Sequence, residues 1–278
     1  MTISNDSSHA AQESTLALDG VEVHVRQDGP RSAPVLLLIH GTAASLHSWD
    51  LLVPLLTGSH HVIRIDLLGC GGTAAPDGAS YAVPDQARLV GAALDRLGVE
   101  QAVVVGHSSG GTVATALAEQ RPDLVTAVAL INTGPHMGAF TVEEIATGPD
   151  RSPDLSDEQL RQMLRSGFGA TYEIPQVFVD QARTMDLHVY GATSQAVRAY
   201  LEERALPDRL APLGKPLLVI FGEEDRRWRP SSAADYHAVD GATVQMLHGS
   251  GHTPIVEDPP GTAAPLLAFA AHHAPQAG

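Results

Sequence analysis

The sequence predicts an α/β fold built on a mostly parallel, doubly wound sheet of about eight strands. Short runs rich in branched apolar residues alternate with longer segments of helical periodicity, which is typical of parallel strands covered by helices on both faces. One long stretch without strand signals interrupts this alternation. The chain has 278 residues, a length that suits one such sheet carrying one insertion.

The first strands are expected to form an N-terminal hairpin. Asp19-Gly20 is a strong turn signal. After it, Val21, Val23 and Val25 alternate with polar residues, a period that predicts a strand with one buried and one solvated face.

The central strands are predicted from branched runs that lie between helix-like segments. The expected strands span residues 35–39, 62–66, 102–105 and 127–131. The expected helical segments span residues 49–56, 85–97 and 109–120. Gly98 ends the second of these segments, as glycine commonly does after a helix.

The alternation of strand and helix signals stops after the sixth predicted strand. Between residues 136 and 210, charged side chains are interleaved with apolar ones in the manner of amphipathic helices. Strand signals return at residues 217–221 and 243–247, followed by a helix from about Pro260. We therefore expect a disordered tail over residues 1–14, a core over residues 15–135 and 211–278, and a helical insertion over residues 136–210.

Charge and composition restrict the classes of partner. Lys and Arg number 17 against 32 Asp and Glu, giving a formal net charge of −15, which disfavours nucleic acid and anionic membrane surfaces. Solubility explains this acidity more simply than the steering of a cationic substrate does. We expect a small-molecule substrate, no nucleic acid, no membrane, and a monomer or homodimer.

Targeting signals and metal or redox chemistry are not indicated. Residues 1–14 lack the basic start and apolar run of a secretory signal, and no apolar run approaches the roughly 20 residues that span a bilayer, so a cytoplasmic protein is expected. Cys70 is the only cysteine; it lies in a glycine-rich segment that resembles a turn more than a nucleophile site. No cofactor and no metal site are predicted.

The most informative motif is Gly106-His107-Ser108-Ser109-Gly110. It fits Gly-x-Ser-x-Gly between a predicted strand and a predicted helix, a context in which a sharp turn exposes a serine nucleophile. The flanking glycines give that turn the room it needs. An ordinary glycine-rich turn is the alternative. The position between strand and helix favours Ser108 as the nucleophile.

A general base and an orienting acid are expected later in the chain. His252 lies in a glycine-bounded loop after the last predicted strand, which suits the order nucleophile, acid, histidine; His248 is a less favoured competitor at the end of that strand. Asp225 follows the preceding strand and is the favoured acid, with Glu223 and Glu224 as a solvated rim.

The tetrahedral intermediate of acyl transfer requires about two N–H donors aimed at the developing oxyanion. One is expected to be the backbone N–H of Ser109. The other is expected from Thr42, in the loop His40-Gly41-Thr42 that follows the strand ending at Ile39. Gly41 lets this backbone turn inward, and His40 is expected to brace the loop.

Together these segments resemble the α/β-hydrolase superfamily, specifically its small cap-bearing serine hydrolases: esterases, lactonases, carbon–carbon bond hydrolases and cofactor-free haloperoxidases. The likeness covers about residues 16–275. The landmarks that carry it are residues 40–42, 66–69, 106–111, 222–225 and 251–259. The resemblance implies that the insertion is a helical cap, or lid, with substrate bound between it and the core. Dehalogenases and epoxide hydrolases of this superfamily use a carboxylate where this chain has Ser108.

The leading hypothesis is a hydrolase of a carboxylic ester or lactone with a small, largely apolar substrate, acting through an acyl-enzyme. Candidate substrate contacts in the insertion are Met163, Phe168, Tyr172 and Phe178, with packing inside the cap as their plainer explanation. A carbon–carbon bond hydrolase is the nearest alternative. A cyclase, dehydratase or cofactor-free oxygenase of secondary metabolism, and a ligand-binding protein with a vestigial triad, are further alternatives.

Overall fold

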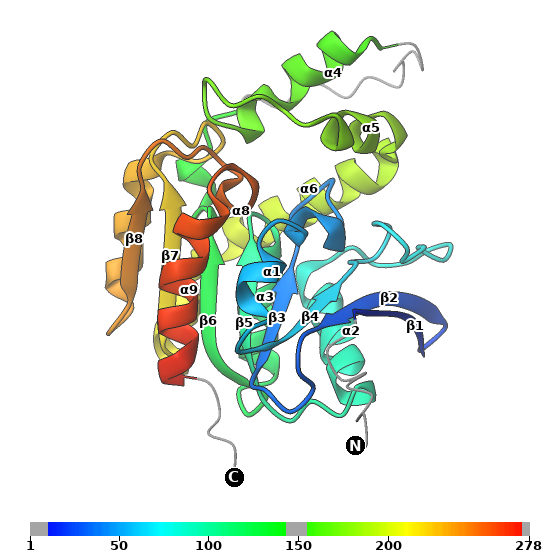
Figure 1. Cartoon of the computed structure of the whole chain (residues 1–278), viewed down its shortest axis with the longest axis vertical. Helices are drawn as coiled ribbons and strands as arrows, with labels where there is room; N and C mark the ends of the chain where they lie inside the picture. The colour runs from blue at the N-terminus through cyan, green and yellow to red at the C-terminus, as the bar shows by residue number, and fades with distance from the viewer. Residues whose placement is uncertain (1–10, 143–154, 274–278) are drawn as a thin grey trace, which may run out of the picture.

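The computed structural model describes residues 11–142 and 155–273, and its described part contains one sheet of eight strands in the order β1-β2-β4-β3-β5-β6-β7-β8 (Figure 1). Strand β2 pairs antiparallel with β1 and β4, and every other neighbouring pair is parallel. The predicted α/β class with a mostly parallel sheet is thereby confirmed. The strands are β1 (Gln12–Leu18), β2 (Val21–Asp28), β3 (Val35–Ile39), β4 (His61–Ile65), β5 (Ala102–His107), β6 (Val125–Ile131), β7 (Leu217–Gly222) and β8 (Thr243–Leu247).

The first strand corrects the expected boundary of the N-terminal tail. Strand β1 begins at Gln12, so residues 12–14 belong to the sheet and not to a tail. They pair with residues 25–27 of β2, and backbone pairing in a hairpin does not require apolar side chains. The turn between the two strands has Asp19 at φ 46° and Gly20 at φ 85°, the left-handed conformations that two-residue hairpin turns need. Residues 1–10 lie outside the described part.

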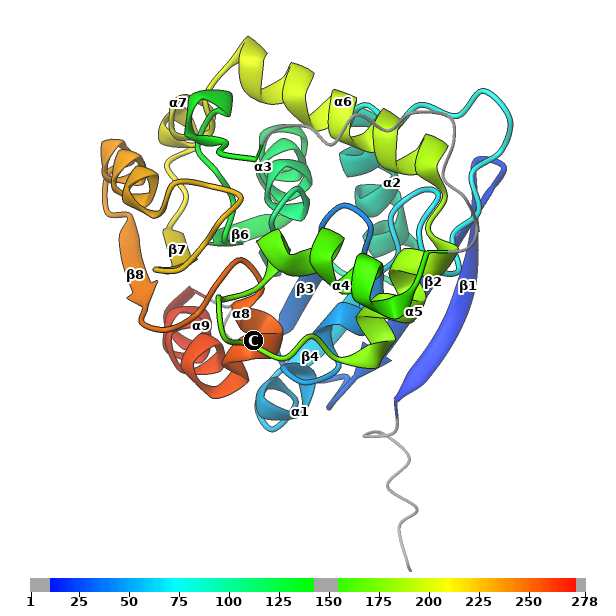
Figure 2. The ribbon, with the colours of Figure 1, turned by 90° about the horizontal axis from the view of Figure 1, so that it is seen from above.

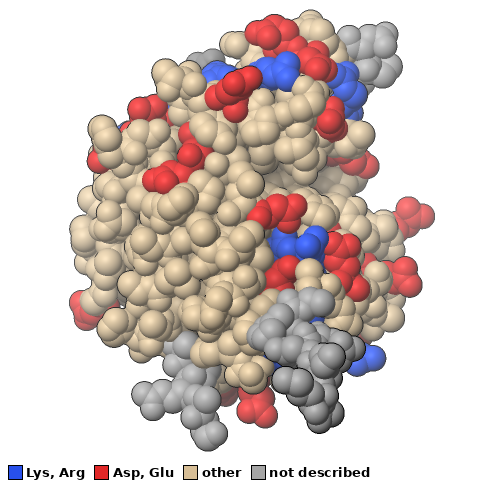
Figure 3. Space-filling view, viewed as in Figure 1, with Lys and Arg blue, Asp and Glu red and all other residues tan. Residues whose placement is uncertain are grey.

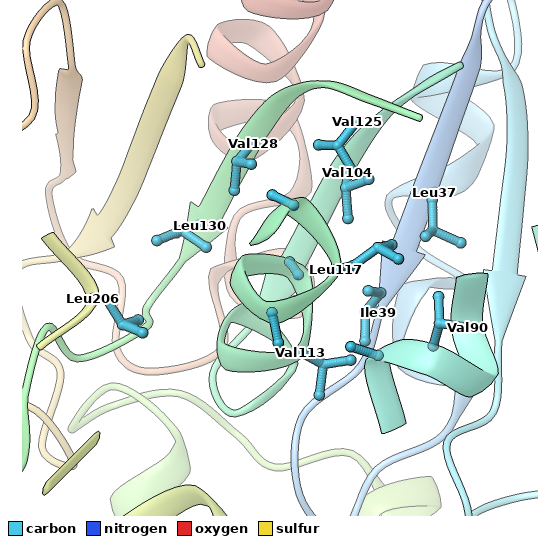
Figure 4. Close-up of a cluster of buried hydrophobic side chains, with 14 of the residues drawn as sticks. Leu37, Ile39, Val90, Val104, Val113, Leu117, Val125, Val128, Leu130 and Leu206 are labelled. Carbon is cyan, nitrogen blue, oxygen red and sulfur yellow. The ribbon is translucent and has the colours of Figure 1, made fainter. Parts of the chain in front are cut away.

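Helices cover both faces of the sheet, and alternate residues of each strand supply the two layers of the core. Leu37 and Ile39 of β3 pack into one buried cluster with helices α2 and α3, as Figure 4 shows. Leu36 and Leu38 face the opposite cluster, with α1 and α9. These helices are α1 (Val53–Leu56), α2 (Val83–Arg96), α3 (Gly110–Gln120) and α9 (Pro259–His273).

The segment expected as one helix over residues 49–56 is two short elements. A 3-10 turn, η2 (Leu46–Trp49), is separated from α1. Pro54 lies in the first turn of α1, where its missing N–H costs nothing but prevents a longer helix from continuing through it. Two further connecting elements are η6 (Pro230–Ala238) and α8 (Pro254–Glu257).

Between β6 and β7 the described chain is helical, and Figures 1 and 2 show α4, α5 and α6 beyond one end of the sheet. We call residues 136–210 the helical insertion; its residues 143–154 lie outside the described part. Across the described ranges, no helix is long and apolar enough to cross a membrane. The elements of the helical insertion are η3 (Met137–Ala139), α4 (Asp157–Leu164), η4 (Arg165–Gly167), α5 (Gln176–Thr184), α6 (Leu187–Glu203) and α7 (Leu206–Leu210), followed by η5 (Ala211–Leu213).

The start of α3 approaches the ends of β3 and β5 so closely that no side chain fits. A Cβ atom on Gly106 would lie 2.5 Å from backbone atoms of Gly110 and Gly111, and one on Gly110 would lie 2.3 Å from the carbonyl oxygen of Ile39. Backbone atoms cannot rotate away as a flexible side chain can. These glycines therefore fix how the strand–turn–helix around Ser108 is packed.

Replacing Gly106 with alanine should destabilise the protein by roughly 2 kcal/mol or more, because overpacking against backbone forces the helix or the strand to move. Urea unfolding followed by circular dichroism measures this change. The matched control is Gly191→Ala in α6, where a Cβ meets nothing within 4 Å and helix propensity favours alanine by about 1 kcal/mol at most. Equal stabilities of the two variants would contradict the packing argument.

Candidate active site

Ser108 occupies a strained turn between β5 and α3. Its φ is +53°, a left-handed conformation that costs a non-glycine residue roughly 1–2 kcal/mol. Its N–H donates to the carbonyl of Ile131 at 2.9 Å, and its own carbonyl accepts the Thr133 hydroxyl at 2.9 Å. The turn is thus tied to the end of β6 on both sides of the serine.

The three residues expected to act together lie in one hydrogen-bonded chain. His252 Nε2 is 2.9 Å from Ser108 Oγ, and His252 Nδ1 is 2.9 Å from Asp225 Oδ2. Because the Asp225 carboxylate accepts the Nδ1 proton, Nε2 is left to accept the hydroxyl proton of Ser108. The carboxylate and the imidazole are both buried, which shields this pair from competing water.

Asp225 is saturated with hydrogen bonds. Besides His252, its Oδ2 accepts the side-chain amide of Asn132 at 2.7 Å, and its Oδ1 accepts the backbone N–H groups of Arg227 and Trp228 at 2.7 and 3.1 Å. Burial opposes ionisation of Asp225, but the charge and hydrogen bond of His252, together with the bonds from Asn132 and Arg227, outweigh it and lower the pKa of the carboxyl. It therefore stays ionised as an acceptor.

Asn132 was not anticipated from the sequence. It follows β6 directly, has φ +46° and is completely buried. Its amide nitrogen also donates to the carbonyl of Gly251 at 3.1 Å, and its side-chain oxygen accepts the N–H of Gly222 at 3.2 Å. One amide thus joins the loops that carry Asp225 and His252.

His107, the residue before Ser108, is hydrogen-bonded to the backbone of His252. Its Nε2 donates to the carbonyl of His252 at 2.8 Å, so the proton of the neutral ring resides on Nε2. Burial, with the neighbouring His252, lowers the pKa of His107 to about 3. A neutral ring is required here because a second positive charge would oppose protonation of His252.

Glu257 holds the loop of His252 from the other side. Its carboxylate accepts the N–H groups of Gly251 and Thr253, the two neighbours of His252, at 3.0 and 2.9 Å. It also accepts the N–H of Gly169 in the helical insertion at 2.7 Å. The Thr253 hydroxyl donates to the carbonyl of Gly167 at 2.6 Å. The loop of His252 and the helical insertion are therefore joined directly.

The residues expected around the oxyanion lie together. The N–H of Ser109 makes no hydrogen bond within residues 11–142 and 155–273, whereas the N–H of Thr42 donates to the Ser109 hydroxyl at 2.6 Å. His40 accepts the N–H of Leu67 at 3.0 Å, and its Nδ1 lies 2.8 Å from the carbonyl of Gly41. These two bonds brace the loop between β3 and η2, the role expected of His40.

The competing residues lie apart from the chain of Ser108. His248 is 96% exposed at its side chain and pairs with Glu223 at 2.9 Å, which raises the pKa of the imidazole. Glu224 is also exposed and reaches the N–H of Ala170 at 3.3 Å. Burial raises the pKa of the Cys70 thiol to about 12, so this thiol stays protonated at neutral pH.

The aromatic residues proposed as substrate contacts pack on one another. The ring of Phe168 stacks on Tyr172 at a centroid distance of 5.6 Å and meets the edge of Phe178 at 5.3 Å. Phe168 is buried, and the Tyr172 hydroxyl donates to the carbonyl of Val256. This favours the packing explanation for Phe168. Met163 in α4 is partly exposed, and contact of any of the four with substrate stays a prediction.

Within the described residues, no group of three or more His, Cys, Asp or Glu side chains could hold a metal ion.

A family model described as alpha/beta hydrolase fold matches residues 34–187, more than half of the 278 residues. The chain belongs to the alpha/beta hydrolase fold family. The match includes Thr42, Ser108 and Ser109, and the loops of Asp225 and His252 lie beyond it. The predicted resemblance to this superfamily is confirmed.

Relatives of this alpha/beta hydrolase cover most of its length. A Bacillus subtilis (strain 168) protein, provisionally named a 2-succinyl-6-hydroxy-2,4-cyclohexadiene-1-carboxylate synthase, is 28% identical over 255 residues, covering 87% of this chain and 92% of that protein. The uncharacterized hydrolase YugF of the same strain is 26% identical, covering 84% and 89%. The crystal structure of a hydrolase from Pseudomonas aeruginosa PA01 matches with a TM-score of 0.77 at 26% identity, covering 92% and 97%. Hydrolase-named relatives support hydrolase chemistry.

The pH dependence of stability tests the environment of Asp225 in this alpha/beta hydrolase. Its folded-state pKa lies below the ordinary value of about 3.9, so the unfolded chain binds the proton more tightly. The stability it contributes is present above about pH 4 and is lost as the pH falls through the folded-state pKa. Between pH 4.5 and 2, urea unfolding should therefore show a steeper loss for the wild type than for Asp225→Asn. Parallel curves would contradict the lowered pKa.

Proposed function

We propose that this alpha/beta hydrolase is a serine hydrolase that cleaves a carboxylic ester or lactone through an acyl-enzyme. The observation that supports it best is the continuous chain from Ser108 Oγ through His252 to Asp225, with both links at 2.9 Å. In this proposal Ser108 is the nucleophile, His252 the general base and Asp225 the residue that orients and stabilises the imidazolium.

The proposed reaction follows from where the protons reside. As Ser108 Oγ attacks the carbonyl carbon, its proton passes to His252 Nε2 and the carbonyl π electrons move to oxygen. Collapse of this intermediate expels the alkoxide, which takes the proton from His252. Water then gives a proton to His252 while its oxygen attacks the acyl carbon, and a second collapse returns the proton to Ser108.

Acyl transfer suits a hydroxyl nucleophile. Chemistry that displaces a halide or opens an epoxide through an ester intermediate needs a carboxylate at the nucleophile position, and Ser108 has none. A carbonyl substrate, in contrast, accepts attack by an activated alkoxide and places negative charge on one oxygen, beside the free N–H of Ser109.

The substrate is proposed to be a small, largely apolar molecule bound beneath the helical insertion, which then acts as a lid. The hydrogen bonds from the Gly169 N–H to Glu257 and from the Thr253 hydroxyl to the carbonyl of Gly167 support this arrangement, because they hold the insertion next to His252. On the face shown in Figure 3, acidic side chains are scattered and not gathered into one patch, which favours solubility over steering as the role of the net charge of −15.

A second candidate is a non-hydrolytic reaction at the same three residues, such as an elimination or a cyclisation. The relative provisionally named as a synthase favours it. His252 and Ser108 would then transfer protons without forming an acyl-enzyme. Reaction in water labelled with ¹⁸O separates the candidates, because only hydrolysis transfers solvent oxygen into the product.

Ser108→Ala should leave the fold intact and lower the turnover of a short-chain p-nitrophenyl ester by roughly 10⁴- to 10⁶-fold. Intact-mass analysis after exposure to a small fluorophosphonate should show one adduct on the wild type and none on the variant. Full activity of Ser108→Ala would exclude the proposed nucleophile. No adduct and no turnover in the wild type would favour a ligand-binding protein with a vestigial triad.

His252→Ala should lower kcat by a similar factor, because no other buried histidine side chain is hydrogen-bonded to Ser108 within the described ranges. His248→Ala is the matched control. Its ring is exposed, and an exposed ion pair contributes little, so kcat/KM should stay within about twofold of the wild type. A large loss in the control with little loss in His252→Ala would reverse the assignment of the base.

A further inference from the structure

The hydroxyl groups of Thr42 and Ser109 form a pair beside Ser108. Ser109 Oγ accepts the backbone N–H of Thr42 at 2.6 Å and the Thr42 hydroxyl at 2.8 Å. Ser109 is buried, with 8% of its surface exposed. The hydroxyl of Ser109 is thus held by two donors that come from the same residue of the opposite loop.

The hydrogen bonds between Thr42 and Ser109 leave some donor groups of Ser109 unused. A serine hydroxyl has two lone pairs and one hydrogen. With the Thr42 hydroxyl as donor in the 2.8 Å contact, both lone pairs of Ser109 Oγ accept from Thr42 and its own hydrogen is left to donate elsewhere; the reverse direction would place that hydrogen on Thr42 Oγ1. The N–H of Ser109 is likewise without a partner in the part of the chain that the structure describes. One residue therefore presents two unused donors directly after the nucleophile.

The backbone N–H of Thr42, expected to reach the oxyanion, is already engaged. Its hydrogen is donated to Ser109 Oγ at 2.6 Å, so this N–H is not free to bind an oxyanion while that hydrogen bond persists. The N–H of Thr42 can still act through the hydroxyl, because a donor that itself accepts two hydrogen bonds is polarised and donates more strongly.

We propose that the Ser109 side-chain hydroxyl, oriented by Thr42, is the second donor of the oxyanion hole beside the N–H of Ser109. This deepens the proposed function and rests on it. In the tetrahedral intermediate the Ser109 Oγ–H donates to the oxyanion, while Thr42 N–H and Thr42 Oγ1–H keep the hydroxyl in place. Ser109 is then a catalytic residue and Thr42 a positioning residue. The rival arrangement has Ser109 rotate away and Thr42 N–H bind the oxyanion directly.

The two arrangements predict opposite effects of Ser109→Ala. Loss of a donor should lower kcat on a p-nitrophenyl ester by about 100-fold, with KM changed far less, because the donor acts on charge that develops in the transition state. Loss of an obstructing hydroxyl would leave kcat unchanged or raise it. Unchanged or raised turnover in Ser109→Ala would overturn the inference.

Thr42 variants separate orientation from general damage to the loop. Thr42→Ser keeps both donors, so its kcat should be higher than that of Thr42→Val. Thr42→Val keeps the N–H but loses the hydroxyl, and should lower kcat by about 3- to 10-fold. The double variant Thr42→Val/Ser109→Ala should have the same kcat as Ser109→Ala alone, because the effects of substitutions at residues that act as a unit are not additive. Fully additive losses would contradict a shared role.

A trifluoromethyl ketone gives a readout that does not depend on turnover. Ser108 Oγ bonds to the ketone carbon, the carbonyl π electrons move to oxygen, and the serine proton passes to His252, so the adduct carries the oxyanion. Its inhibition or dissociation constant should rise in Ser109→Ala by the factor by which kcat/KM falls. An unchanged constant would overturn the inference alone. A wild type with neither adduct nor ester turnover would overturn both the inference and the proposed function.

Discussion

The site depends on the left-handed backbone of Ser108. At φ +53° the serine leaves the line of β5 and its hydroxyl meets His252, but the conformation is unfavourable by roughly 1–2 kcal/mol and must be enforced by packing. The glycines around it allow α3 to press against β3 and β5. Of the four non-glycine residues with positive φ in the described ranges, Ala43, Ser108 and Asn132 follow β3, β5 and β6. Strain is concentrated where the parallel strands end.

The backbone around His252 is held by hydrogen bonds to three side chains. Glu257 binds the N–H groups on either side of His252, His107 binds its carbonyl, and Asn132 binds the preceding carbonyl and the Asp225 carboxylate. Glu257 is the last residue of α8, His107 the last residue of β5, and Asn132 follows β6 directly. An imidazole fixed in this way needs little reorganisation when it accepts a proton, and low reorganisation is the main source of electrostatic stabilisation in enzymes.

Much of the sheet could be predicted because short runs of branched apolar residues favour a strand over other conformations. Strands β3 and β8 span the predicted residues, and the order of Ser108, Asp225 and His252 followed from strand ends. Glu257 lies in the landmark segment 251–259, but its contacts and those of Asn132 escaped prediction, because a single polar residue after a strand or within a short helix carries no periodic signal. Their importance arises from contacts with residues about 90 and 120 positions away, or across to the helical insertion. The same holds for the Ser109 hydroxyl, whose partner is 67 positions distant.

In the proposed reaction, proton transfer and oxyanion stabilisation use residues on different loops. The proton passes from Ser108 to His252, and the negative charge of Asp225 stabilises the resulting imidazolium. The electrons of the carbonyl move the other way, toward the proposed oxyanion donors of Ser109. Since the carboxylate of Asp225 is already satisfied by four hydrogen bonds, it does not compete with the oxyanion for the donors of Ser109. In the proposed reaction, positive charge develops on His252 and negative charge on the carbonyl oxygen, on opposite sides of Ser108 Oγ. The first charge develops beside Asp225 and the second beside Ser109, and both of these residues are already oriented before the reaction begins.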